Sequence, residues 1–85
     1  MRVKLDHEHR DTLEQVFSHS RNVEWRRVLS LLEAVGTVTQ HRNGKIEVVV
    51  GGETHVFLPP RHKDVDEQLL VDVRKLLRHA GLEPA

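Results

Sequence analysis

The chain has 85 residues, enough for one domain with a single modest core. It contains no cysteine, which excludes disulfides and cysteine-based zinc sites. Lysine plus arginine and aspartate plus glutamate each number 13, so the formal net charge is zero and disfavours strong nonspecific binding of nucleic acid. No apolar run approaches membrane-spanning length, and the N-terminus lacks the apolar segment of a signal peptide. We therefore expect a single cytoplasmic domain over residues 1–85, with no cofactor and no membrane contact.

The first predicted helix has a narrow apolar face. Asp6 can cap its N-terminus, and the helix runs to about Ser18. A helix with so few apolar positions is unstable alone and has to pack on another part of the protein. Its apolar positions are Leu13, Val16 and Phe17.

The second predicted helix is strongly amphipathic. It begins at Val23 or Glu24, with Asn22 as a candidate N-cap, and it ends at Val35. Gly36 follows directly, at a position where glycine typically ends a helix in the left-handed conformation. The apolar face of this helix consists of Trp25, Val28, Leu29, Leu32 and Val35.

A three-stranded antiparallel sheet is predicted after this helix. Residues 37–41 alternate and form a first strand, and the turn at 42–44 contains Asn-Gly, a strong hairpin signal. Residues 45–50 and 53–58 are rich in β-branched and aromatic side chains, and Gly51–Gly52 between them suits a tight turn. A two-residue turn pairs Val50 with Glu53, Val48 with His55 and Ile46 with Phe57.

Both faces of this sheet carry apolar side chains, whereas a sheet with one face in water normally shows one polar face. One face has Ile46, Val48, Val50 and Phe57. The other has Val49, Val56 and Leu58. We therefore expect both faces to be covered.

A third predicted helix follows the sheet. Pro59–Pro60 end the last strand, because proline cannot donate a hydrogen bond to a sheet. A basic connector at 61–63 leads to a helix that begins at Asp64 or Asp66 and ends near Ala80. The predicted fold class is therefore α+β with the element order α-α-β-β-β-α, in which two helices lie on one face of a three-stranded antiparallel sheet and the N-terminal helix is an addition.

Several short stretches carry a resemblance to a known family. They are Leu31–Leu32–Glu33 through Gly36, then Gly44, Val56–Phe57–Leu58–Pro59, Lys63–Asp64–Val65 and His79–Ala80–Gly81–Leu82. In these stretches the chain resembles the HicA family, small toxins of bacterial toxin–antitoxin pairs. The resemblance implies a fold similar to double-stranded-RNA-binding domains, with residues 22–82 as a HicA-like core and residues 6–19 as an added N-terminal helix.

The resemblance departs from the family at the catalytic position. Members of the family degrade RNA with a histidine in a Gly-x-His element at the start of the second strand. If Gly44 matches that glycine, Ile46 occupies the place of the histidine, and a slip of one residue puts Lys45 or Glu47 there. None of these side chains is a near-neutral acid–base catalyst. We therefore expect a HicA-like protein that lacks nuclease activity and acts through protein contacts or weak RNA binding.

The alternative is an active mRNA interferase toxin that uses a displaced histidine and is restrained by an antitoxin. His55 is the best candidate for that catalytic residue, because it lies on the third strand close to the lost position. A structural, hydrogen-bonded histidine on the sheet is the competing interpretation. His41 on the first strand is a weaker candidate.

An apolar sheet face at the place where a nuclease binds RNA indicates a contact surface instead. We expect the N-terminal helix, from the same chain or from a second copy in a homodimer, to cover this face. The predicted interface residues are Leu13, Val16, Phe17, Ile46, Val48 and Phe57.

The region from the first strand to the last helix is mildly basic. Double-stranded-RNA-binding domains contact the phosphate backbone near the start of their last helix, which makes RNA a candidate partner beside an antitoxin or other protein. Acidic residues at the same helix start oppose phosphate binding, and a second basic cluster at 74–78 is explained by the helix dipole alone. The predicted RNA-binding residues are Gly44, Lys45, Arg61 and Lys63.

Two other patterns have mainly structural interpretations. His7-Glu8-His9 contains a His-x-His spacing, but helical positions two apart do not share a face, so we expect no metal there. Trp25 and Phe57 could stack on RNA bases. Trp25 falls on the apolar face of the second helix, which favours packing in the core.

Overall fold

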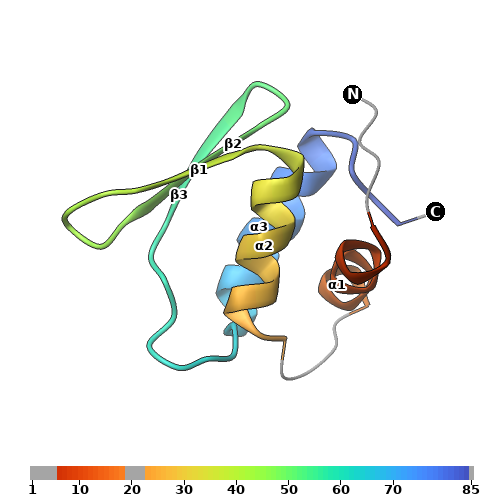
Figure 1. Ribbon diagram of the computed structural model, residues 1–85, viewed down its shortest axis with the longest axis horizontal. Coiled ribbons are helices and arrows are strands. Elements are labelled where there is room, and N and C mark those ends of the chain that lie inside the picture. The colour runs from red at the N-terminus through yellow and green to blue at the C-terminus, as the bar shows by residue number, and fades with distance from the viewer. Residues whose placement is uncertain (1–5, 19–22, 85) are drawn as a thin grey trace.

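The computed structural model describes residues 6–18 and 23–84, and these ranges form three helices and one three-stranded sheet (Figure 1). The order is α-α-β-β-β-α, which confirms the predicted α+β class. Within the described ranges no helix is long and apolar enough to cross a bilayer. The elements are α1 (His7–Phe17), α2 (Trp25–Val35), β1 (Thr37–Gln40), β2 (Ile46–Val50), β3 (Glu53–Phe57) and α3 (Glu67–His79).

Aspartate side chains cap the N-termini of two of the helices. The carboxylate of Asp6 accepts a hydrogen bond from the His9 N–H at 2.9 Å, and that of Asp66 accepts one from the Leu69 N–H at 2.8 Å. Such caps satisfy N–H groups that the first helical turn leaves without partners. The candidate cap Asn22 lies outside the described residues. Glu24 stands at the N-cap of α2, and its side chain makes no capping hydrogen bond.

The sheet has the strand order β1-β2-β3, and both pairs are antiparallel. The predicted pairing of β2 with β3 is confirmed residue by residue, from Val50 opposite Glu53 to Ile46 opposite Phe57. Gly51 and Gly52 both have positive φ, as the two-residue turn requires. This register places one row of apolar residues on each face of the sheet.

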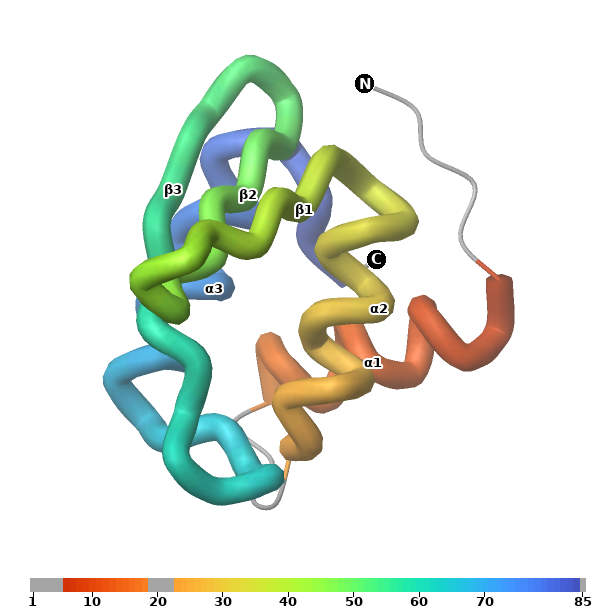
Figure 2. Tube along the Cα trace, turned by 60° about the vertical axis from the view of Figure 1, so that its left-hand side comes forward, coloured from red at the N-terminus to blue at the C-terminus, as the bar shows by residue number. Residues whose placement is uncertain are grey.

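The helices form two layers on one side of the sheet. α2 and α3 pack directly on it, and α1 packs on α2 and α3 from the side away from the sheet (Figures 1 and 2). The sheet residues beneath α2 and α3 are at most 3% exposed. They are Ile46, Val48, Val50 and Phe57.

The prediction that the N-terminal helix covers this face is therefore wrong. α2 and α3 each present a broad apolar face, and together they cover the sheet. The narrow stripe of α1 is buried against these helices instead, with Leu13 and Val16 in the core. The predicted interface residues are covered by other parts of the same chain. Five of the six are buried, and the sixth, Phe17, is half-buried beneath the guanidinium of Arg78.

The opposite face of the sheet is open, so the prediction that both faces are covered is wrong as well. Val56 is 54% exposed and Leu58 is 66% exposed, and they are the exposed large apolar residues of the described chain. We call this surface, formed by Val49, Val56 and Leu58 with their neighbours on the same side of the strands, the open face.

A buried arginine connects α3 to α1. Arg74 is only 8% exposed, and its Nε–H donates a hydrogen bond of 2.7 Å to the carbonyl oxygen of Val16. That carbonyl lies in the last turn of α1, where carbonyl groups lack partners within the helix and attract positive charge. The Arg78 guanidinium lies 5.6 Å from the centre of the Phe17 ring, a cation–π contact. Two cations of the cluster at 74–78 are thus engaged with α1.

Gly36 has a different role from the predicted one. Its φ is −162°, which is extended backbone and not the left-handed conformation. A Cβ at this position would lie 2.1 Å from the carbonyl oxygen of Val49 and 2.8 Å from the side chain of Val50. Glycine is required because the end of α2 passes directly against β2.

We expect Arg74→Met to lower the free energy of unfolding by about 1–3 kcal/mol, because the buried Val16 carbonyl loses its donor while the packing volume is kept. Urea titration followed by circular dichroism measures this. Lys75→Met, an exposed change on the same helix, is the control and should stay within about 0.5 kcal/mol of the native protein. Equal stability of the two variants would contradict the role of Arg74.

We expect Gly36→Ala to destabilise the fold by about 1–3 kcal/mol, because its methyl group overlaps the backbone of β2 and forces the strand or the helix to move. Gly52→Asn is the matched control, since Gly52 has φ 85° with open space around it and asparagine tolerates that conformation. Thermal unfolding compares the two variants. A Gly36→Ala protein that melts with the native one would show that α2 and β2 do not approach so closely.

Candidate nucleic-acid interface

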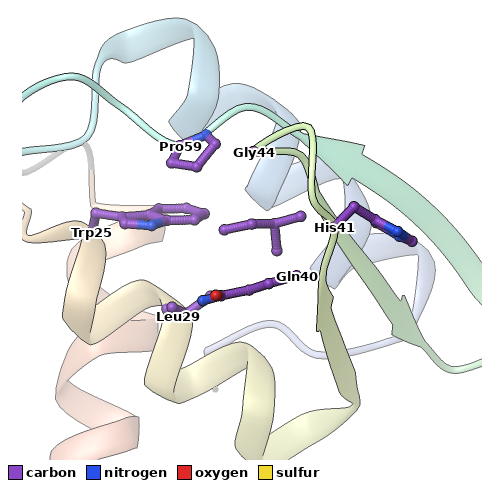
Figure 3. A pocket seen from close by; sticks show the side chains of 7 residues that line it. Trp25, Leu29, Gln40, His41, Gly44 and Pro59 are labelled. Carbon is purple, nitrogen blue, oxygen red and sulfur yellow. The ribbon is translucent and has the colours of Figure 1, made fainter.

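An open hollow of about 200 Å³ lies where the start of α2, the β1–β2 turn and the segment after β3 meet. Most of its lining residues are apolar, and the two polar side chains among them are a carboxamide and an imidazole. The lining residues are Trp25, Leu29, Gln40, His41, Gly44, Ile46 and Pro59 (Figure 3). We call this feature the Trp25 hollow.

Trp25 is positioned by its helix and by the loop between β3 and α3. Its backbone N–H donates a hydrogen bond of 2.8 Å to the carbonyl oxygen of Lys63, and the N–H of Val65 donates one of 2.8 Å to the carbonyl oxygen of Val23. Glu24 and Asp64 face each other across this short antiparallel bridge. The indole is half-buried, packs against the core and still lines the hollow.

The β1–β2 turn supplies the opposite rim. The N–H of Gly44 donates to the carbonyl oxygen of His41 at 3.0 Å, and the side chain of Asn43 accepts from the N–H of Lys45 at 3.0 Å. Gly44 has φ 87°, a conformation that glycine adopts without strain. The turn therefore places Gly44 on the hollow and leaves the Lys45 side chain exposed beside it.

The two segments that carry the four predicted RNA-binding residues both reach Trp25 or the hollow beside it. Gly44 lines the hollow and Lys45 follows it, while Lys63 is bonded through its backbone to Trp25. Arg61 lies in the short segment between Pro59, which lines the hollow, and Lys63. The side chains of all three cations are exposed, so each is accessible to a phosphate group.

Acidic residues near this rim are partly withdrawn from it. The Asp66 carboxylate accepts the Leu69 N–H and is directed to its own helix. Glu24 and Asp64 are half-buried at the bridge between the two chain segments. Asp66 and Glu67 are nevertheless exposed at the start of α3, so the predicted repulsion of phosphate there remains.

Sequence reasoning did not identify Gln40 as part of the site. Gln40 lies on β1 opposite Ile46, on the helix-covered face of the sheet, and its side chain reaches the hollow at the sheet edge. Within the described residues its carboxamide has no hydrogen-bond partner. A polar residue on the core-facing side of an edge strand is the signal that could have revealed it.

His55 lies apart from the hollow. It is on β3 opposite Val48, and its ring stacks on that of Phe57 with centroids 5.5 Å apart and an angle of 22° between the ring planes. Its Nδ1 atom is enclosed and finds no hydrogen-bond partner within the described residues. Neither a carboxylate nor a hydroxyl there orients this imidazole for proton transfer. The competing interpretation, a structural histidine held by hydrogen bonds, is not supported at Nδ1 either, because this atom has no hydrogen-bond partner within the described residues.

His41 has a partner. Its Nε2 atom lies 3.2 Å from Oε1 of Glu47, and both side chains are well exposed. The imidazole borders the Trp25 hollow but points away from the other lining side chains (Figure 3). His41 and Glu47 thus form an exposed imidazole–carboxylate pair beside the basic turn.

The histidines of α1 bind carboxylates of the same helix region. His7 lies 3.5 Å from the carboxylate of Asp11, and His9 lies 3.1 Å from that of Asp6. The other nitrogen of His9 is 2.9 Å from the hydroxyl of Ser30 on α2. This order of groups is that of a Ser-His-Asp triad, but Ser30 lies inside a helix whose N–H groups are engaged and cannot form an oxyanion hole. In residues 6–18 and 23–84 no group of three potential metal ligands occurs.

No protein-family model, curated protein or solved structure matches this chain.

Proposed function

We propose that this chain is a HicA-like protein that lacks the nuclease chemistry of the family and binds RNA weakly through the rim of the Trp25 hollow. The observation that carries the proposal is the convergence of two basic segments, the β1–β2 turn and the loop before α3, on one half-buried tryptophan. These segments are distant in the sequence. Lys45, Arg61 and Lys63 are exposed cations carried by these two segments, and we assign them to phosphate groups.

The loss of nuclease chemistry is supported by the positions of Ile46 and His55. Ile46, which stands where the family has its catalytic histidine, is 3% exposed beneath the helices and is an aliphatic residue without an acid–base function. His55 is stacked on Phe57 and has an enclosed, unpartnered nitrogen. A proton-transfer residue needs a partner that orients it and an open path to the substrate.

Weak binding follows from the charge. Each phosphate contact made by a lysine or arginine releases a condensed counterion, and this term supplies most of the nonspecific affinity for nucleic acid. The two segments contribute three exposed cations to the proposed contact, and the chain has no net charge to add a long-range attraction. The complex is therefore expected to be sensitive to salt.

A protein partner is the second part of this proposal. The resemblance implies an antitoxin as partner, and another protein or a second copy would serve in a protein that acts by contact alone. Val56 and Leu58 make the open face the place for such a contact, because exposed apolar side chains next to each other favour association. We place the protein in the cytoplasm.

An active mRNA interferase is the second candidate function, and the His41–Glu47 pair favours it. A carboxylate 3.2 Å from the imidazole can hold the ring in one orientation and stabilise its protonated form. The pair lies next to Lys45 and Arg42, which would bind the phosphates on either side of a cleaved bond. In this candidate His41, rather than His55, is the displaced catalytic histidine.

We expect RNA affinity to fall with salt, and Lys45→Ala and Arg61→Ala each to reduce the slope of log affinity against log salt by about 1. Fluorescence anisotropy of a labelled RNA at several salt concentrations measures the slope. Lys75→Ala, an exposed cation of α3, is the charge-matched control and should leave the slope unchanged. Equal slopes for all four proteins would contradict the assignment of this rim to phosphate.

We expect induction of the protein in a bacterial host to leave growth and transcripts intact, and His55→Ala to change neither. Culture density and transcript integrity are followed after induction. Growth arrest with cleaved transcripts that disappears in His41→Asn would establish the interferase instead. If His55→Ala abolished the growth arrest and His41→Asn did not, His55 on β3 would be the catalytic histidine.

A further inference from the structure

We propose that the Trp25 hollow receives a single unpaired base of RNA, stacked against the indole and contacted along its edge by Gln40. This inference rests on the proposed RNA-binding function and deepens it. It adds a class of ligand, single-stranded RNA, and a recognition group that the sequence pattern did not indicate.

The walls of the hollow suit a flat aromatic ring. The indole of Trp25 forms one side, and the ring of Pro59 lies above it in Figure 3. Leu29 and Ile46 also line the hollow, so a ligand entering from solvent meets several apolar side chains. Stacking on an aromatic side chain is the common way in which proteins hold unpaired bases.

The polar group in the hollow is placed for the edge of a base. The carboxamide of Gln40 extends below the indole in Figure 3 and offers both a donor and an acceptor. Within the described residues it has no hydrogen-bond partner, so it is free to bind a ligand. A purely apolar ligand would leave this group without a partner and would fit the hollow less well.

The size and the charge of the site narrow the ligand further. Pockets for drug-sized ligands are typically 300 Å³ or more, by order of magnitude, so a hollow of about 200 Å³ suits a smaller group such as one base. The segments that supply Gly44 and Pro59 to the hollow also carry the exposed cations Lys45, Arg61 and Lys63, which favours a base attached to an anionic backbone over a neutral aromatic group. Bases within a duplex are stacked and paired, so only an unpaired nucleotide can enter.

Trp25 is the single tryptophan of the chain, which makes its fluorescence a direct reporter of the hollow. The experiment titrates the full-length protein with an octamer of uridylate, an octamer of adenylate and a double-stranded RNA of 16 base pairs. Tryptophan emission and the anisotropy of end-labelled RNA are recorded in parallel. We expect both single strands to quench the emission as they bind, and the duplex to bind more weakly without quenching.

Variants separate the stacking contact from the backbone contacts. Trp25→Leu should lower the affinity for single strands about five- to 150-fold, while Trp25→Phe retains most of it. Because Trp25 also packs on the core, Gln40→Leu is the second variant, and Thr39→Leu, one residue away on the opposite face of β1, is its matched control. We expect Gln40→Leu to weaken binding and to change the preference between uridylate and adenylate, and Thr39→Leu to do neither.

Two results would overturn the inference and are distinguishable. Binding without quenching, with the affinity unchanged in Trp25→Leu and Gln40→Leu, would leave the phosphate-binding function in place and remove the base from the hollow. If none of the three RNAs bound at low salt, both the proposed RNA-binding function and the proposed base site would be wrong.

Discussion

Two backbone hydrogen bonds, which join residues 23–25 to residues 63–65, hold the start of α2 against the loop before α3. α2 has no side-chain cap at Glu24, and the loop before α3 takes the place of one by accepting the Trp25 N–H. The same contact holds Lys63 beside the tryptophan and directs the segment after Pro59 along the start of the helix. A contact that satisfies the backbone of α2 thus also forms one wall of the hollow. The same hydrogen bonds therefore stabilise the start of α2 and shape the hollow.

The distribution of positive charge follows from the packing of the helices. Arg74 and Arg78 belong to the most basic stretch of the sequence, but both are directed to α1, one to a carbonyl oxygen and the other to an aromatic ring. Lys45, Arg61 and Lys63 instead come from a turn and a loop, where the backbone is exposed and the side chains are accessible. Exposed cations also lie on the helices, for example Arg10 on α1 and Arg26 on α2.

Local patterns in the sequence were sufficient for the elements and for the pairing of β2 with β3. Asp6 and Asp66 act through their nearest helical turn, and Gly51–Gly52 determine the register of the two strands on either side. The relation between elements was not predictable in the same way. An apolar row on a strand shows that the face is buried but does not say by which helix, and the N-terminal helix was assigned to a face that α2 and α3 occupy.

The candidate site shows the same division. Gly44, Lys45, Arg61 and Lys63 were identifiable by residue type, but the approach of their two segments to Trp25 depends on contacts between parts far apart in the chain. Gly36 was recognised as a helix end, although its requirement for glycine comes from the carbonyl oxygen of Val49 on another strand. Such a steric requirement has no local signature. Gln40 was missed because the pairing of β1 with β2, which puts this residue on the helix-covered side of the sheet, was not predicted residue by residue.

The hydrogen bond from Arg74 to Val16 has a consequence for how the chain can be divided. Without α1, Arg74 would lose its acceptor on Val16 and would have to be hydrated. The apolar surfaces of α2 and α3 that now pack on α1 would at the same time be exposed to water. The N-terminal helix is therefore an integral layer of this molecule, and its removal would cost both a buried hydrogen bond and part of the core.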